Sequence, residues 1–294
     1  KVQTGMVGYK LSLSGLKGGH SGVDIVLGRG NANKLLFRFL KYAVSELGVR
    51  LSAIEGGSLR NAIPREAFAT VVLPANMVDD FIETVAEFEE MFSSELELVE
   101  PNLKFVATPC ALPSTIIDEM TQDDLINAVQ GCPNGVVRMS NSMPGVVETS
   151  TNLAIIKSDE RTIQVLSLIR SSVDTAKEDV ESTIASIFRL AGAEVRFHGQ
   201  YPGWQPNMDS DILKTMLYVY EQKYGIVPKI TAIHAGLECG ILGGIYPNWD
   251  MISFGPTIRH PHSPDEKVNI ETVAKFWQFL TATLEAIPEK LSRQ

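Results

Sequence analysis

The hydrophobic and polar positions of residues 1–199 switch repeatedly between the period of a strand and the period of a helix. Single apolar and polar residues in alternation indicate a half-buried strand, and apolar residues three or four apart indicate a helix. In chain order this predicts a strand at 7–14, a helix at 31–47, strands at 50–54 and 67–73, a helix at 77–92 and a strand at 103–108. The resulting β-α-β-β-α-β order is that of a ferredoxin-like sandwich.

Further elements follow within the same segment. A short helix is predicted at 122–130, strands at 146–156 and 162–170, a helix from 175 to 192 and a strand at 193–198. The hydroxyl and carboxylate side chains of 171–175 are suited to capping the helix that follows them. The stretch 109–145 is otherwise less regular, and rich in glycine, proline and asparagine toward its end.

The pattern changes at Tyr201-Pro-Gly-Trp-Gln-Pro206. Beyond it the sequence predicts a helix at 209–224, a strand at 228–233, a helix from Ala235, a strand at 249–254 and a helix at 270–286. This alternation is typical of a parallel α/β layer, but three strands at most are too few for a covered parallel sheet. We therefore expect one domain at 1–199 and, at 200–294, part of a second whose remainder lies before Lys1. A trimmed chain with a complete fold is the alternative.

Composition and charge narrow the class of protein. The 294 residues carry a net charge of −9, and 44% are hydrophobic and 21% charged, which is ordinary for a globular protein. The acidic balance and the lack of a basic run argue against a nucleic-acid partner. No apolar run is long enough to predict a membrane span. The three cysteines lie far apart with no CxxC pair, so the sequence predicts no disulfide framework and fits a reducing cytoplasm.

The loop after Gly255-Pro256 has the form of a metal-binding loop, because it follows a strand-like run and contains His260 and His262. A histidine in that position can present an imidazole nitrogen to a metal. The bend expected at Pro261 favours one binding and one solvated histidine. A catalytic zinc normally takes three or more protein ligands, so this loop alone is an incomplete site.

The other candidates are ambiguous when each is taken singly. His20 lies among glycines in Gly18-Gly-His-Ser-Gly22, which let the backbone approach a ligand, and for it the functional and structural interpretations are evenly balanced. For His234, which lies just before a predicted helix, a functional role is favoured no more than a structural one. Asn61 either has a role in binding or only satisfies hydrogen bonds of the turn backbone. Arg170 either clamps a carboxylate or pairs with Asp174.

Four motifs occur together in the order seen in one family. They are Gly18-Gly-His-Ser-Gly22, Gly57-Ser-Leu-Arg-Asn-Ala-Ile-Pro64, Ile233-His-Ala-Gly-Leu-Glu-Cys-Gly240 and His262-Ser-Pro-Asp-Glu266. With them the whole chain resembles the bacterial aminoacyl-histidine dipeptidases, within the di-zinc exopeptidases related to carboxypeptidase G2. The resemblance implies a ferredoxin-like lid that forms the contact of a homodimer, here 1–199, and a catalytic α/β domain, of which 200–294 is the C-terminal part.

The resemblance also implies a role for each matching residue. His262 matches the last zinc ligand of the family. His20 matches a lid histidine that reaches the scissile carbonyl oxygen of a bound dipeptide, usually across the dimer. Asn61 and Arg170 match lid residues that hold the substrate carboxylate or the oxyanion, and the Gly236 backbone matches a substrate contact. Two zinc ions in the intact, cytoplasmic enzyme would activate a water that attacks the peptide.

The departure from the family is large, because the other zinc ligands and the glutamate general base match nothing in these residues. The chain resembles roughly the last three-fifths of the enzyme, and alone it is expected to bind zinc weakly and to lack peptidase activity. Two alternatives remain. One is a non-catalytic dimerisation or binding module derived from the lid. The other is a related exopeptidase that acts on another small peptide or on an acylated or carbamoyl compound.

Overall fold

The structure, a computed structural model, describes residues 2–232, 234, 238–259 and 266–287. The chain separates into two compact units. The first comprises Lys1–Gln200 with Ile233–Ala235, and the second comprises Tyr201–Ala232 and Gly236–Gln294. The roles predicted for 1–199 as a lid and for 200–294 as part of a catalytic domain stay predictions.

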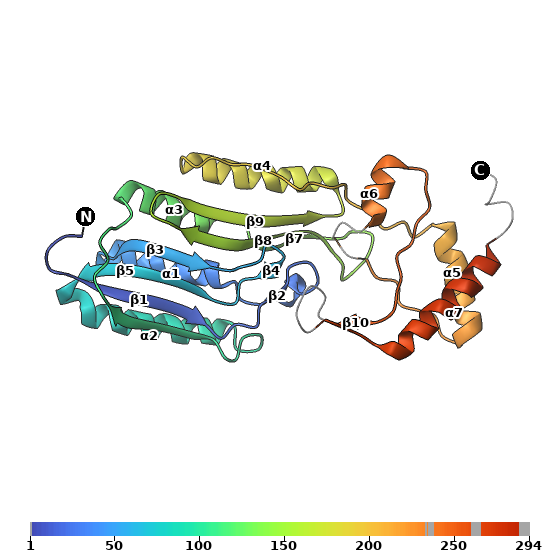
Figure 1. Ribbon diagram of the computed structural model, residues 1–294, viewed down its shortest axis with the longest axis horizontal. Coiled ribbons are helices and arrows are strands. Elements are labelled where there is room, and N and C mark those ends of the chain that lie inside the picture. Colours follow the sequence, from blue (N-terminus) through green and yellow to red (C-terminus); the bar gives the residue numbers. More distant parts are fainter. Residues whose placement is uncertain (1, 233, 235–237, 260–265, 288–294) are drawn as a thin grey trace. The chain divides into compact units, whose positions relative to one another are not determined.

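The first unit is built on four antiparallel strands whose order confirms the predicted ferredoxin-like fold. The strands are β1 (Met6–Ser14), β3 (Arg50–Gly56), β5 (Ala67–Pro74) and β6 (Lys104–Cys110). They lie side by side in the order β6-β1-β5-β3 (Figure 1). Taken as first to fourth in the chain, this is the order fourth-first-third-second, which a split βαβ unit produces because each helix connects strands that are not neighbours.

Three further strands extend this sheet to seven. They are β7 (Gly135–Met139), β8 (Val147–Ser158) and β9 (Ile163–Ser171). Strand β8 pairs with β3 near its end, with β7 along its beginning and with β9 along its other edge. Residues 147–154 are all buried, so both faces of β8 are covered there. Sequence patterning did not predict β7.

Helices cover the sheet and supply most of the core. They are α1 (Ala32–Leu47), α2 (Val78–Glu95, after a short 3-10 turn Ala75–Met77), α3 (Glu119–Gly131) and α4 (Asp174–Leu190). Helix α1 begins at Asn31, whose side chain accepts the Lys34 N–H, and ends at Gly48 in the left-handed conformation. Phe39 of α1 makes edge-to-face contacts with three other aromatic rings, those of Phe81, Phe88 and Phe105. Such contacts add to the stabilisation from apolar burial.

Two very short strands lie apart from the main sheet, and the first of them carries His20. Strand β2 (Gly19–His20) pairs with β4 (Ala62–Ile63), and a 3-10 turn at Ile25–Leu27 follows β2. The turn that leads into β4 passes close to β8 at Gly57, which has φ 72°. A Cβ there would overlap the Ala154 carbonyl oxygen, so only glycine allows the turn to approach the strand this closely.

The described residues of the second unit form three helices and one pair of short antiparallel strands. The helices are α5 (Asp211–Tyr224), α6 (Glu238–Ile245) and α7 (Ile270–Ala286), and the strands are β10 (Ile258–Arg259) and β11 (Lys267–Val268). Helices α5 and α7 pack through a small core in which the Tyr220 ring meets Phe279 edge to face.

The strands predicted at 193–198, 228–233 and 249–254 are wrong for the residues that the structure describes. Residues 193–198, 228–232 and 249–254 have no strand assignment. A strand requires a hydrogen-bonded neighbour, and an apolar run with β-forming residues does not supply one. None of these runs pairs with another segment within the described part of the chain.

The three cysteines, Cys110, Cys132 and Cys239, are free thiols. In the described residues, no helix combines the length and the apolar character needed to cross a membrane.

Candidate functional site

Ser21 links three residues of the first unit that were selected from the sequence. His20 precedes it in β2, opposite Ala62 of β4. The Ser21 N–H donates to the Asn61 carbonyl at 2.8 Å, and Arg170 Nε lies 3.4 Å from Ser21 Oγ. His20, Asn61 and Arg170 are far apart in the sequence, and the structure brings them into one neighbourhood of the first unit.

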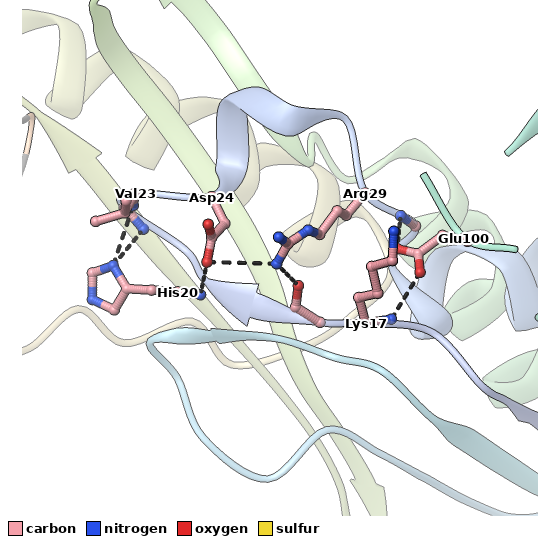
Figure 2. Close-up of polar contacts among 9 residues, drawn as sticks. Lys17, His20, Val23, Asp24, Arg29 and Glu100 are labelled. Atoms are coloured by element: carbon pink, nitrogen blue, oxygen red, sulfur yellow. Dashed lines mark hydrogen bonds and ion pairs between the residues drawn. The ribbon is translucent and has the colours of Figure 1, made fainter. Parts of the chain in front are cut away.

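The His20 ring is held by the backbone that follows it. Its Nδ1 accepts the N–H groups of Gly22 and Val23, each at 3.2 Å (Figure 2). An Nδ1 that accepts two N–H groups cannot itself carry a proton, so the neutral ring carries its proton on Nε2. His20 is half-buried. The geometry therefore prepares Nε2–H as a hydrogen-bond donor.

Asn61 occupies a turn that is held by the buried side-chain amide of Asn152. Asn152, on β8, is fully buried, and its Nδ2 donates to the carbonyls of Arg60 and Ala62 at 3.2 and 2.8 Å. These carbonyls flank Asn61 on both sides. The backbone of Asn61 is thereby fixed, and its half-buried side chain is held at a defined place near β2.

Arg170 is only 8% exposed and lies on β9, directly opposite Ser150 of β8. The planar guanidinium presents paired N–H donors, which suit a carboxylate. Arg170 therefore has the chemistry and the position required to bind an anionic group next to His20.

His234 completes this polar layer. Its Nε2 lies 2.6 Å from Ser150 Oγ, and the side chain is 4% exposed. Burial, and then electrostatic interaction with Arg170 and His20, lower the pKa of His234 from 6.5 to about 4. His234 is therefore neutral near pH 7, where it adds no charge to the site.

The depressed pKa of His234 predicts a loss of stability in acid. Between about pH 4 and 6.5 the unfolded chain binds the proton more readily than the folded chain. The free energy of unfolding should therefore rise with pH through this window. The contribution of His234, about 3 kcal/mol, should be fully present above pH 6.5 and should be lost as the pH falls toward 4. His234→Gln should remove that part of the pH dependence.

Circular dichroism during urea unfolding at pH 4.5 and 7.0 measures this difference. Tryptophan fluorescence is unsuitable, because Trp204, Trp249 and Trp277 all belong to the second unit. An unchanged pH dependence in His234→Gln would contradict the assignment.

The predicted metal ligand and one predicted substrate contact lie outside the described residues. These are His262 and Gly236, and His260 lies there as well. Among the described residues, no three His, Cys, Asp or Glu side chains form a group that can hold a metal ion. The described residues therefore do not fit a complete metal site, and the predicted role of His262 stays a prediction.

Sequence reasoning missed Ser21, Ser150 and Asn152. A signal for two of them was present, since the strand that is buried on both faces carries a run of consecutive polar residues at 148–152. Buried polar residues require polar partners, which the apolar core cannot supply. Here the partners are the β4 turn and His234.

Comparison with known proteins shows that the chain is similar to peptidases. Residues 11–100 match the family model described as a peptidase dimerisation domain. The chain is 44% identical over 289 residues to the cytosol non-specific dipeptidase of Escherichia coli strain K12, a match that spans 98% of the chain and 60% of the relative. It superposes on the crystal structure of aminoacylhistidine dipeptidase from Vibrio alginolyticus with a TM-score of 0.89 and 49% identity, over 98% of the chain and 59% of that structure.

Both matches cover nearly all of this chain. The chain nevertheless spans only about three-fifths of the length of each relative. Identity of this extent, together with the same fold, reflects common ancestry. Over nearly all of its length the chain is therefore similar to two proteins named dipeptidases, and its residues 11–100 are similar to a peptidase dimerisation domain.

Proposed function

We propose that this chain forms the lid and part of the catalytic domain of a metal-dependent dipeptidase that hydrolyses Xaa-His dipeptides. Its relatives are named a non-specific dipeptidase and an aminoacylhistidine dipeptidase. The observation that carries the proposal is the convergence of His20, Asn61 and Arg170 around Ser21. A donor, an amide and a guanidinium at one place suit a small substrate with a carbonyl and a carboxylate.

Each lid residue has a distinct task in this proposal. Arg170 binds the substrate carboxylate through paired N–H groups, and the Asn61 amide adds a neutral hydrogen bond. Together they fix the dipeptide against rotation, which lowers the entropic cost of reaching the transition state. The His20 Nε2–H donates to the scissile carbonyl oxygen, where negative charge develops as the carbonyl is attacked.

The metal, proposed to be two zinc ions, would supply an activated water when bound. His262 would be one ligand, and we place the others in the part of the relatives that this chain does not span. Such sites take several protein ligands, so residues 1–294 alone would hold zinc weakly. The enzyme formed by joining residues 1–294 to that remaining part is called the completed enzyme below.

The partner of the chain is proposed to be a second copy of itself. The match of residues 11–100 to a dimerisation domain supports a homodimer formed through the first unit. A small dipeptide is the substrate, no nucleic acid or membrane is involved, and the place of action is the cytoplasm, in keeping with a relative named as a cytosol enzyme.

Zinc content and Ala-His hydrolysis, measured on the same zinc-supplemented samples, test the proposal. Residues 1–294 alone should retain little zinc after gel filtration and show no turnover. The completed enzyme should retain about two zinc ions per subunit and hydrolyse Ala-His, and chelation should abolish the activity. Tightly bound zinc with turnover in residues 1–294 alone would overturn the assignment of the ligands. A completed enzyme that binds zinc without cleaving Ala-His would favour another substrate or a binding module.

A further inference from the structure

The His20 loop is held by a set of polar contacts centred on Asp24. We propose that Asp24 is a positioning residue for His20, which sets both the place and the tautomer of the imidazole. The proposal rests on the proposed function, because it gives His20 a task in which position matters. Figure 2 shows the residues concerned.

Asp24 binds both backbone polar groups of His20. Its Oδ2 accepts the His20 N–H at 2.8 Å, and its own N–H donates to the His20 carbonyl, also at 2.8 Å. These reciprocal bonds close a tight turn over residues 20–24. The turn fixes the direction in which the imidazole leaves the backbone.

The same turn determines which ring nitrogen carries the proton. The N–H groups that meet His20 Nδ1 come from Gly22 and Val23, which lie inside the turn closed by Asp24. If the turn opened, these N–H groups would no longer be held toward Nδ1, and the ring would be free to protonate on either nitrogen. The Nε2–H donor is thus a consequence of the turn.

Arg29 holds Asp24 in place from the other side. Its Nη1 lies 3.6 Å from Asp24 Oδ2 and donates to the Gly18 carbonyl at 2.6 Å. Gly19 has a φ of 133°, and a Cβ there would overlap both Arg29 and Asp24. Glycine at this position lets the ion pair lie directly against the strand that carries His20.

Both ends of this segment are attached to one buried carboxylate. Glu100 is 1% exposed, and its two oxygens accept the N–H groups of Lys17 at 2.7 Å and Gly30 at 3.0 Å. Figure 2 shows this anchor beside Arg29. Because Glu100 fixes the ends, a change at Asp24 acts on the turn between them without releasing the whole segment.

Asp24 therefore acts on His20 locally. Its side chain is 27% exposed and that of Arg29 is 23% exposed, so the ion pair itself contributes little to global stability. A misplacement of about 1 Å in a group that meets the transition state costs on the order of 10²-fold in rate. The effect of losing Asp24 should thus appear in kcat and in the state of the His20 ring.

The test compares Asp24→Ala and Asp24→Asn in the completed enzyme. Asp24→Ala should lower kcat for Ala-His by roughly 10- to 100-fold, with KM and zinc content nearly unchanged. In ¹⁵N NMR spectra, the His20 ring should change from one tautomer to a mixture. Asp24→Asn keeps an oxygen that can accept the His20 N–H, and it should recover most of the activity.

Asp159→Ala is the matched control. Asp159 also closes a turn in the first unit, where it accepts the N–H groups of Arg161 and Thr162 between β8 and β9. It should leave kcat and the His20 tautomer unchanged. A double variant completes the design, because Asp24→Ala should have no further effect on kcat once His20 is alanine.

The outcomes separate the inference from the function on which it rests. If His20→Ala alone leaves kcat unchanged, the proposed function of His20 fails. If His20→Ala lowers kcat but Asp24→Ala does not, or if the two effects multiply in the double variant, the positioning role of Asp24 is wrong.

Discussion

Replacing His20 with alanine in the completed enzyme is expected to lower kcat for Ala-His by roughly 10²- to 10³-fold, which is the usual cost of removing one donor to a developing oxyanion. KM should change little, because the ground-state carbonyl attracts the donor less strongly than the charged oxygen of the transition state does. The backbone bonds to Nδ1 hold the Nε2–H donor in place before substrate arrives. Steady-state kinetics with zinc-saturated enzyme measure both constants.

His198→Ala is the control for this prediction. His198 is an exposed histidine of the same unit, and its Nδ1 lies 3.4 Å from Arg60 Nη1. Its loss should leave both constants within about twofold, as is usual for surface changes away from a site. Equal effects of the two variants, or a His20→Ala effect confined to KM, would argue against an oxyanion donor.

Mixed dimers can show which subunit supplies His20. One subunit carries His20→Ala and the other His262→Ala, each of which is expected to be nearly inactive as a homodimer. If His20 acts across the dimer, every mixed dimer contains one intact site, so random mixing should restore about a quarter of the wild-type activity. If His20 acts within its own subunit, mixing should restore none.

The first unit could be predicted largely from its sequence because its pairing partners lie within it. Strands β1, β3, β5 and β6 each carry the alternation of a half-buried strand, and the helices between them carry the helical period. The ferredoxin-like order then follows from the order of the elements. The short strands β2 and β4 could not be predicted, because two residues have no measurable period.

The runs at 228–232 and 249–254 show the limit of the same reasoning. Their apolar residues have the composition of buried strands, but hydrogen-bonded neighbours decide whether such a run becomes a strand. Composition carries no information on whether those neighbours are present. In 193–198 the period-2 alternation likewise occurs without a neighbour among the described residues.

The candidate site was predictable only in part, because long-range contacts assemble it. His20, Asn61 and Arg170 were each ambiguous when taken alone, and only the resemblance to the family selected them together. The contact between Ser21 and Arg170 spans 149 residues of sequence, which no local pattern reveals. Asp24 and Asn152 were missed because each acts through backbone atoms of other residues.

Arg170→Met in the completed enzyme is expected to raise KM for Ala-His by roughly 10- to 100-fold, since a hydrogen-bonded charge pair contributes about 1.5–3 kcal/mol. Methionine fills much of the same buried space, and it removes the charge opposite Ser150. Arg170→Lys should recover only part of the affinity, because an ammonium group cannot bind a carboxylate through two parallel N–H bonds. Steady-state kinetics on all three proteins measure the effect.

A substrate without the carboxylate distinguishes a clamp from a structural arginine. The amide Ala-His-NH₂ should bind the wild type poorly, and Arg170→Met should weaken its binding little further, because the interaction is already absent. The same substitution should raise the pKa of His234, since the charge of Arg170 contributes to its depression to about 4. NMR titration of His234 measures that rise and shows whether the buried layer has kept its arrangement. Equal losses of affinity for the acid and the amide, with the expected rise of the His234 pKa, would mean that Arg170 does not hold the substrate carboxylate.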